Sequence, residues 1–271
     1  MNPMAIELKN LSVTYTGGGR TTLAVRNCSF SVARGDIVGL VGESGSGKSS
    51  ALMAIPHLLP AGTLVSGEIL CDGENLAALD ERGMGAWRWR RIALVPQGAM
   101  NSFTPHLTIG RHITEVLEHH LRLDRGTARG RAVELLDTVG LGEEAFFRYP
   151  HELSGGQKQR AALAAALACG PDFLLADEPT TALDVITQKE VLDMTASLVR
   201  KSGMGLLLVT HDLPLAAGIC DSLVVMKDGA AVESGPSRQV AANPKNAYTG
   251  LLIDSIRDME RPRDETATRG S

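Results

Sequence analysis

Residues 42–49, GESGSGKS, match the pattern G-x-x-x-x-G-K-[ST] of a phosphate-binding loop. Glycines let backbone N–H groups close around phosphate oxygens, and the start of a helix adds favourable partial positive charge. Lys48 can reach the β- and γ-phosphates of a nucleotide, and Ser49 can ligate Mg²⁺. An apolar run at residues 36–41 precedes the loop and a helical pattern follows it, so we expect a strand, the loop and a helix in that order.

Two adjacent carboxylates, Asp177 and Glu178, follow an apolar run at residues 173–176. A carboxylate at the end of a buried strand can hold the shell of Mg²⁺, and the next carboxylate can polarise an attacking water. An exposed loop or a helix cap would also account for two such residues. Because a phosphate loop is expected in the same sheet, the pattern favours the catalytic interpretation.

A third motif, LSGGQ at residues 153–157, precedes an alanine-rich helical stretch at residues 161–168. Ser154 is a good N-cap residue, and two glycines at a helix start allow an anion to approach bare N–H groups. By itself this pattern usually marks a local helix cap. In this chain it is a second candidate phosphate site.

Together these motifs resemble those of the ABC-type ATPases. Residues 42–49 resemble the Walker A loop, residues 173–178 the Walker B strand with its hydrolytic glutamate, and residues 153–157 the signature motif. The resemblance implies that the chain binds ATP and Mg²⁺. It also implies a head-to-tail dimer, in which the signature of one nucleotide-binding domain closes over ATP held by the other.

Further positions of that family follow in the expected order. Tyr15 resembles the aromatic residue that stacks on adenine, Gln97 the Q-loop residue, residues 182–184 (ALD) the D-loop and residues 210–212 (THD) the H-loop. Taken singly, each would also fit ordinary packing or solvent exposure. Their common order with the three motifs supports the resemblance.

The resemblance implies a role for each matching residue. The implied catalytic residues are Glu178, His211, Gln97 and Lys48, and the implied Mg²⁺ ligands are Ser49, Gln97 and Asp177. The implied nucleotide contacts are Tyr15, Gly42, Glu43, Ser44, Gly45, Ser46, Gly47, Lys48, Ser49, Ser50, Gln97, Ser154, Gly155, Gly156, Gln157 and Asp184.

Within this family, the chain resembles the ATPase subunits of peptide and nickel importers, notably at residues 95–102 and 177–185. Residues 243–249, NPKNAYT, resemble the NP-x-HPYT element of these subunits, with Asn246 and Ala247 where His-Pro is usual. The implied function is ATP hydrolysis that energises import of peptides, nickel or a similar small solute. The implied location is the cytoplasmic side of the inner cell membrane, as a peripheral subunit.

The implied partners are a second nucleotide-binding subunit, two transmembrane permease subunits and, indirectly, an external solute-binding protein. The nucleotide-binding partner is either a second copy or a related ATPase. Two alternative functions stay open: a soluble ABC-type ATPase that does not serve transport, and a half of a heterodimer that binds ATP but hydrolyses it weakly.

The predicted fold is α/β: a P-loop NTPase (RecA-like) core with an N-terminal antiparallel β-layer and an inserted helical subdomain. Alternating residues at 6–9, 11–15 and 24–32 predict the β-layer, and short apolar runs at 92–95, 173–176 and 205–209 predict a parallel sheet. The predicted core comprises residues 1–97 and 153–235. We expect the helical insert at 98–152, with helices at 109–121 and 128–139, and a short C-terminal extension at 236–271.

Composition excludes several other classes of protein. Hydrophobic residues make up 44% of the 271 residues, so the chain can bury a core, and the longest apolar run is too short to span a bilayer. A net charge of −4 disfavours nucleic acid as a partner. The four isolated cysteines predict reduced structural thiols, and the first residues lack a secretory signal pattern.

Two features lie outside these motifs. The run WRWRR at residues 87–91 suggests a structural or docking role in an acidic chain. His112, His119 and His120 are expected on a solvated helix face, because a spacing of seven residues is too long for one metal ion. The charged segment from residue 257 to the end is expected to be frayed.

Overall fold

The computed structural model describes residues 4–181 and 183–260, and it contains two β-sheets. The first sheet is antiparallel, in the order β2-β1-β4-β5. Its strands are β1 (Ala5–Gly17), β2 (Arg20–Ala33), β4 (Leu64–Cys71) and β5 (Glu74–Asn75). The predicted β-layer is thereby confirmed. The alternating runs at 6–9 and 11–15 belong to one strand, which continues through a bulge at Asn10 (φ 51°).

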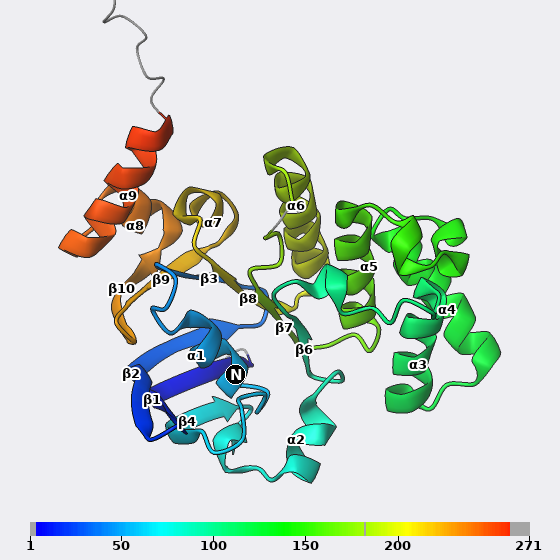
Figure 1. Cartoon of the computed structure of the whole chain (residues 1–271), viewed down its shortest axis with the longest axis horizontal. Helices are drawn as coiled ribbons and strands as arrows, with labels where there is room; N and C mark the ends of the chain where they lie inside the picture. Colours follow the sequence, from blue (N-terminus) through cyan, green and yellow to red (C-terminus); the bar gives the residue numbers. More distant parts are fainter. Residues whose placement is uncertain (1–3, 182, 261–271) are drawn as a thin grey trace, which may run out of the picture.

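The second sheet has the order β10-β9-β3-β8-β7-β6 and lies at the centre of the molecule (Figure 1). Its strands are β3 (Ile37–Val41), β6 (Ile92–Val95), β7 (Phe173–Asp177), β8 (Gly205–Thr210), β9 (Ser222–Lys227) and β10 (Ala230–Pro236). All neighbours pair in parallel except the antiparallel pair β9 and β10. The parallel α/β sheet predicted from short apolar runs is confirmed.

Helices and the antiparallel sheet cover opposite faces of this core sheet. Alternate residues of one strand divide between two hydrophobic clusters, since Leu206 and Leu208 join one and Leu207 and Val209 the other. The first cluster includes helices α5, α6 and α7, and the second includes α1 and the antiparallel sheet. The helices of the core are α1 (Lys48–Ala54), α2 (Glu81–Trp87), α5 (Gly155–Leu167), α6 (Val185–Ser202), α7 (Leu213–Ile219), α8 (Ser237–Ala242) and α9 (Ala247–Glu260).

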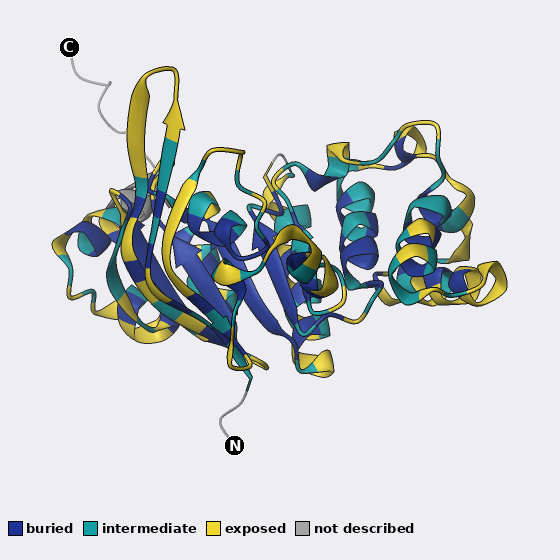
Figure 2. Ribbon diagram, turned by 90° about the horizontal axis from the view of Figure 1, so that it is seen from below, coloured by how far each residue is buried: buried dark blue, intermediate teal, exposed yellow. Residues whose placement is uncertain are grey.

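A helical insert projects from one end of the core, where Figure 2 shows buried helix faces turned toward one another. It consists of α3 (Ile109–Leu121) and α4 (Arg125–Thr138), with short 3-10 turns η2 (Ala99–Asn101), η3 (Glu143–Phe147) and η4 (Pro150–Glu152). A further 3-10 turn, η1 (Leu76–Ala78), belongs to the antiparallel layer. Both predicted helices are present, and Asp124 caps α4 three residues earlier than expected. Helix α5 contacts both α4 and β6, and the boundaries at residues 98 and 152 stay a prediction.

Some expectations about single residues are wrong. His112 is half-buried and packs edge-on against Phe103, with ring centroids 5.1 Å apart, and His120 is half-buried against Trp89. His119 is the exposed one of the three histidines. The face of α3 that carries His112 and His120 is turned toward neighbouring residues rather than fully to solvent. Helix α9 continues to Glu260, so the frayed segment does not begin at residue 257, and residues 261–271 lie outside the described residues.

All four cysteines are free, as predicted for reduced thiols. Cys28, Cys71 and Cys220 are buried, and burial raises the pKa of the Cys28 and Cys71 thiols to about 11. These thiols are therefore protonated at neutral pH. Among the described residues, the helices are too short or too polar to cross a membrane.

Candidate functional site

The phosphate loop joins the buried strand β3 to helix α1. Gly47, the N-cap of α1, has a left-handed backbone (φ 99°), and the helix begins at Lys48. The Lys48 Nζ atom donates to the backbone oxygens of Gly42 at 2.8 Å and Glu43 at 2.7 Å, and to Ser46 Oγ at 3.4 Å. Burial lowers the pKa of Lys48, against the charges of Glu178 and Asp177, which raise it. The ammonium is thus held inside the loop, beside two carboxylates.

Only glycine fits at two positions of this loop. A Cβ atom on Gly42 would lie 2.2 Å from the backbone oxygen of Met226, and one on Gly47 would lie 2.3 Å from that of Ala24. The turn between β9 and β10 fixes the loop further, because the N–H of Gly229 donates to the Ser46 oxygen at 3.1 Å. The same turn accepts the N–H of Arg26 on β2 at 2.8 Å, through the Gly229 oxygen. Neighbouring backbone therefore shapes the loop from two sides.

Ser49 and Asp177 meet at the carboxyl end of the core sheet. The Ser49 hydroxyl donates to Asp177 Oδ1 at 3.0 Å, and Asp177 is only 2% exposed. Burial raises the pKa of Asp177 and the charge of Glu178 adds to this, while the bond from Ser49 and the charge of Lys48 lower it. The net effect is that the ionised carboxylate is less favourable here than in water. A bound cation would offset this cost, so the Ser49–Asp177 pair is a candidate cation site.

An Asp177→Asn variant is expected to unfold at a higher temperature than the wild type at pH 7 while losing Mg²⁺-dependent ATP hydrolysis. A folded-state pKa above the unfolded value favours folding below the unfolded pKa and opposes it as pH rises through the folded pKa. The amide removes this cost and still accepts the Ser49 hydroxyl. We expect a gain of about 2–4 °C, or about 1 kcal/mol.

Thermal denaturation without nucleotide or Mg²⁺, followed from pH 8 down to the ordinary aspartate range at about pH 4, measures this gain. The difference should narrow as pH falls, because the wild-type carboxyl then takes up its proton. A lower melting temperature of the variant at pH 7–8 would contradict the electrostatic account.

Glu178 lies one residue beyond β7 and is held by three side chains. Its Oε2 atom accepts Gln97 Nε2 at 3.2 Å and Thr181 Oγ1 at 3.1 Å, and its Oε1 atom lies 3.4 Å from His211 Nδ1. Glu178 has φ 42°, a conformation that costs a non-glycine residue energy and persists where the surroundings impose it. Its N–H donates to the Val209 oxygen at 2.9 Å, which fixes that turn.

These residues line one cavity of about 1170 Å³. Of the residues predicted for the site, the lining contains Tyr15, Gly42, Glu43, Ser44, Gly45, Gly47, Lys48, Ser49, Ser50, Gln97, Glu178 and His211. Tyr15 comes from β1, and its hydroxyl lies 2.9 Å from Ser50 Oγ on α1. Ser46 and Asp177 are buried behind the lining. Asp212 of the H-loop motif also lines the cavity, together with residues that the sequence did not predict for the site: Thr22, Ala24, Pro214, Leu215 and Leu252.

The signature residues are absent from this lining in the described part of the chain. Ser154 caps α5 by accepting the Gln157 N–H at 3.3 Å, and Gln157 returns a bond to the Ser154 N–H at 3.0 Å. Gly155 and Gly156 follow in the first turn, and Asp184 likewise caps α6. Helix α5 packs on the face of the sheet opposite to α1. Ala182 of the predicted D-loop lies outside the described residues.

The donor set fits Mg²⁺. Ser49 and Asp177 supply a hydroxyl and a buried carboxylate at one point, and oxygen ligands are those that Mg²⁺ takes together with nucleotide phosphates. Gln97 is the third predicted ligand. Its side chain donates to Glu178 and, among the described residues, makes no hydrogen bond with Ser49 or Asp177. Mg²⁺ ligation by these residues stays a proposal.

Comparison with known proteins agrees with this geometry. The family model described as ABC transporter matches residues 25–181. The oligopeptide transport ATP-binding protein OppD of Bacillus subtilis is 38% identical over 97% of this chain and 75% of its own length. The peptidoglycan transport ATP-binding protein YejF of Agrobacterium fabrum is 42% identical over 97% of this chain, which spans about half (49%) of YejF.

A solved structure of the ATP-binding cassette MJ0796, described as a dimer in a post-hydrolysis state bound to ADP and Pi, is similar with a TM-score of 0.76. It is 32% identical, and the match covers 86% of this chain and 99% of that one. The fold agrees with this structure, and the sequence identity extends over nearly the whole chain. The chain therefore belongs to the ABC transporter family, among the ATP-binding proteins of its peptide-transport branch.

Proposed function

We propose that this chain hydrolyses ATP to drive a peptide importer, as one half of an ATP-sandwich dimer bound to two membrane permease subunits. The observation that carries the proposal is the arrangement of Glu178, with Gln97 and His211, in the cavity into which the phosphate loop opens. The relatives are peptide and peptidoglycan transport proteins, so we take peptides rather than nickel as the cargo.

Hydrolysis needs a base, a charge clamp and an oriented water. Glu178 accepts a proton from the water while the water oxygen attacks the γ-phosphorus. The bond between that phosphorus and the bridging oxygen breaks, and this oxygen leaves with ADP. Lys48 and His211 stabilise the charge that develops on the phosphoryl oxygens. When bound at Ser49 and Asp177, Mg²⁺ neutralises part of that charge. Tyr15, half-buried beside Ser50, offers a ring face for adenine.

A dimer completes the site in this proposal. Gly155 and Gly156 lie outside the cavity of their own chain and form the first turn of α5, where their N–H groups can receive a nucleotide on a partner. Val185 and Ile186, 81% and 74% exposed, form an apolar patch at the start of α6, directly after Asp184. Exposed apolar patches of this kind mark association surfaces. The nucleotide-binding partner is a second copy or a related ATPase.

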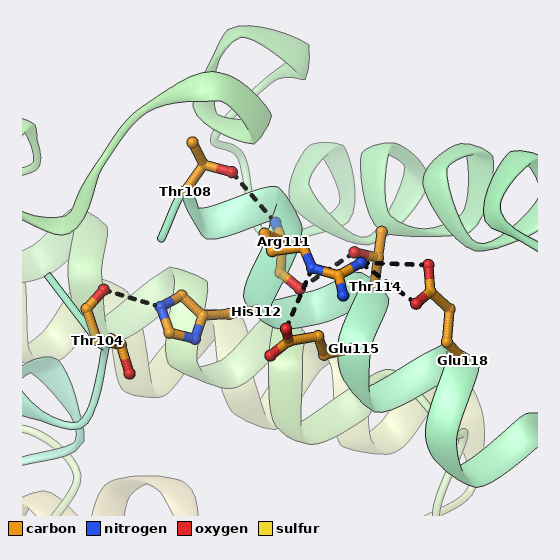
Figure 3. Close-up of polar contacts among 7 residues, drawn as sticks. All are labelled: Thr104, Thr108, Arg111, His112, Thr114, Glu115 and Glu118. Carbon is orange, nitrogen blue, oxygen red and sulfur yellow. Dashed lines mark hydrogen bonds and ion pairs between the residues drawn. The ribbon is translucent and has the colours of Figure 1, made fainter. Parts of the chain in front are cut away.

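A groove of about 440 Å³ between the core and the helical insert is the proposed docking site for the permease. Its lining is mostly apolar, with contributions from Phe103 and Val116, and Gln97 follows the lining residues Val95 and Pro96 directly. Helix α3 contributes His112, Glu115 and Val116 to this lining, and Figure 3 shows polar contacts along this helix. The His112 Nε2 atom lies 3.2 Å from the Thr104 oxygen, and on the same helix Arg111 binds Glu115 at 3.1 Å.

This groove lies between β6 and α3, so a helix seated in it would press on both. The backbone of Gln97 begins the link from β6 to the insert. Its side-chain Nε2 atom donates to Glu178. Movement of the insert would therefore reach the hydrolytic site through one side chain. Docking of a short amphipathic helix, with its apolar face in the groove, suits this lining.

A Val116→Asp variant is expected to reduce recovery of the permease subunits by more than about tenfold, because a charge in an apolar groove forfeits the burial of the docking helix. ATP affinity of the isolated chain should be unchanged. A Leu64→Asp variant is the matched control, since Leu64 is 63% exposed on the antiparallel layer, away from the groove. Equal recovery from both variants would locate the docking site elsewhere.

The function is tested by purifying the tagged chain in mild detergent, identifying its partners and reconstituting the complex in liposomes. ATP-dependent uptake of a labelled oligopeptide by a complex with two membrane subunits is the expected result. A soluble partner without membrane subunits would support a soluble ABC-type ATPase instead. A complex that binds ATP without hydrolysing it would identify a weakly hydrolysing half of a heterodimer.

A further inference from the structure

Tyr248, at the start of helix α9, contacts the phosphate loop although it lies outside the nucleotide-binding motifs described above. Its hydroxyl accepts the backbone N–H of Glu43 at 3.2 Å. The side chain is only 8% exposed, and Lys227 Nζ lies 4.6 Å from the centre of its ring. Leu252, one turn further along α9, lines the nucleotide cavity. The C-terminal segment is thus a wall of this site.

The peptide between Gly42 and Glu43 is held at both ends. Its N–H donates to Tyr248, and its carbonyl, that of Gly42, accepts Lys48 Nζ at 2.8 Å. A hydrogen bond at one end of an amide polarises the group and strengthens the bond at the other end. Tyr248 and Lys48 are therefore linked through one amide plane, although they lie on α9 and α1.

Tyr248 is itself fixed by the chain that precedes it. Its N–H donates to Asn246 Oδ1 at 2.9 Å. The carboxylate of Glu233 on β10 accepts the N–H groups of Lys245 at 2.8 Å and Asn246 at 3.1 Å. Burial raises the pKa of Glu233, but these bonds outweigh it and hold the pKa below its usual range, so the carboxylate is ionised at neutral pH. The backbone that carries the Tyr248 phenol is therefore held in place by these hydrogen bonds.

The phenol is also a stable neutral acceptor. Burial raises the pKa of Tyr248, the bond from the Glu43 N–H lowers it, and the charges of Glu43 and Asp228 raise it further. Lys227 faces the ring but not as a hydrogen-bond partner of the hydroxyl in the described residues. The hydroxyl therefore keeps its proton throughout the neutral range.

We propose that Tyr248 is a positioning residue for nucleotide binding: its hydroxyl orients the Gly42–Glu43 peptide and, through it, directs Lys48 toward the phosphates. This inference rests on the proposed ATPase function. A bond that holds this peptide in place lowers the ordering cost that ATP binding would otherwise meet. The C-terminal segment and the nucleotide are therefore coupled, and loosening one weakens binding of the other.

The test is a Tyr248→Phe variant of the full chain in its transporter complex, assayed for ATP hydrolysis over a range of Mg·ATP concentrations. Phenylalanine keeps the ring and its packing and removes only the hydroxyl. Loss of one neutral hydrogen bond predicts about a three- to tenfold rise in KM for ATP. We expect kcat to change less than about twofold, because Glu178 is untouched. The control is Tyr149→Phe, the same change on an exposed ring that stacks on His151.

Hydrogen exchange gives a second reading, since the Glu43 amide should exchange faster in Tyr248→Phe while the amides of β3 stay protected. An unchanged KM in a variant that folds normally would overturn the proposal, whatever its melting temperature. If the wild type and Tyr149→Phe also fail to hydrolyse ATP, the proposed function is what fails. Active controls with an unaltered Tyr248→Phe profile overturn the role of Tyr248 alone.

Discussion

A Glu178→Gln variant should bind Mg·ATP as tightly as the wild type but hydrolyse it about 10²–10⁴-fold more slowly. Glutamine has the same length and can still accept from Gln97 and Thr181, so the cavity keeps its shape. It has no basic carboxylate to take the proton of the attacking water. The contact with His211, at 3.4 Å, also loses its charge. Binding and turnover are therefore expected to separate.

Single-turnover release of phosphate measures this effect without a contribution from product release. Glu190→Gln is the matched control, because Glu190 lies on α6, is 58% exposed and pairs with Arg160 rather than with the site. Its turnover should equal that of the wild type. A Glu178→Gln enzyme with more than about a tenth of wild-type turnover would remove the carboxylate from its role as base.

A Gly47→Ala variant should lose about 3 kcal/mol of unfolding free energy and most of its affinity for ATP. The left-handed backbone at φ 99° costs alanine about 1 kcal/mol or more. Its Cβ would also lie 2.3 Å from the Ala24 oxygen, and backbone cannot swing aside as a flexible side chain can. The loop must open, which displaces the N–H groups that would receive phosphate.

Gly45→Ala separates these two causes. Gly45 is also left-handed, at φ 81°, but a Cβ there meets nothing within 4 Å. Denaturant unfolding without nucleotide should show a loss of only about 1 kcal/mol for this variant, the conformational cost alone. Equal losses for the two alanines would mean that the close contact with Ala24 is relieved without cost.

The sequence predicted the parts of the site that depend on local pattern. The phosphate loop requires glycines at fixed spacing, and its buried strand requires an unbroken apolar run, so both are visible in the residues themselves. The end of β7 follows the same logic, and Asp177 and Glu178 lie where a carboxylate pair after a buried strand was expected. The capping of α5 by Ser154 is likewise local.

What the sequence missed depends on contacts between distant segments. Strand β4 pairs with β1 although five of its eight residues are exposed, so it lacks the apolar alternation that identifies a strand. Strand β9 is the opposite case, since the run LVV within it is apolar and could have been recognised. Leu252 and Tyr248 reach the site only because α9 packs back over the loop, about 200 residues away in sequence.

The turn between β9 and β10 has a consequence for how this chain can change over evolutionary time. It joins the phosphate loop to β2 through backbone atoms alone, from Ser46 to Gly229 and from Gly229 to Arg26. Replacement of the side chains at Arg26 or Asp228 leaves both bonds intact. Insertion of a single residue would move Gly229 out of reach of both partners. Drift at this corner is therefore constrained in length, and at Gly229 also in residue identity, because its φ is 84° and a Cβ there would lie 2.9 Å from the Ala24 oxygen.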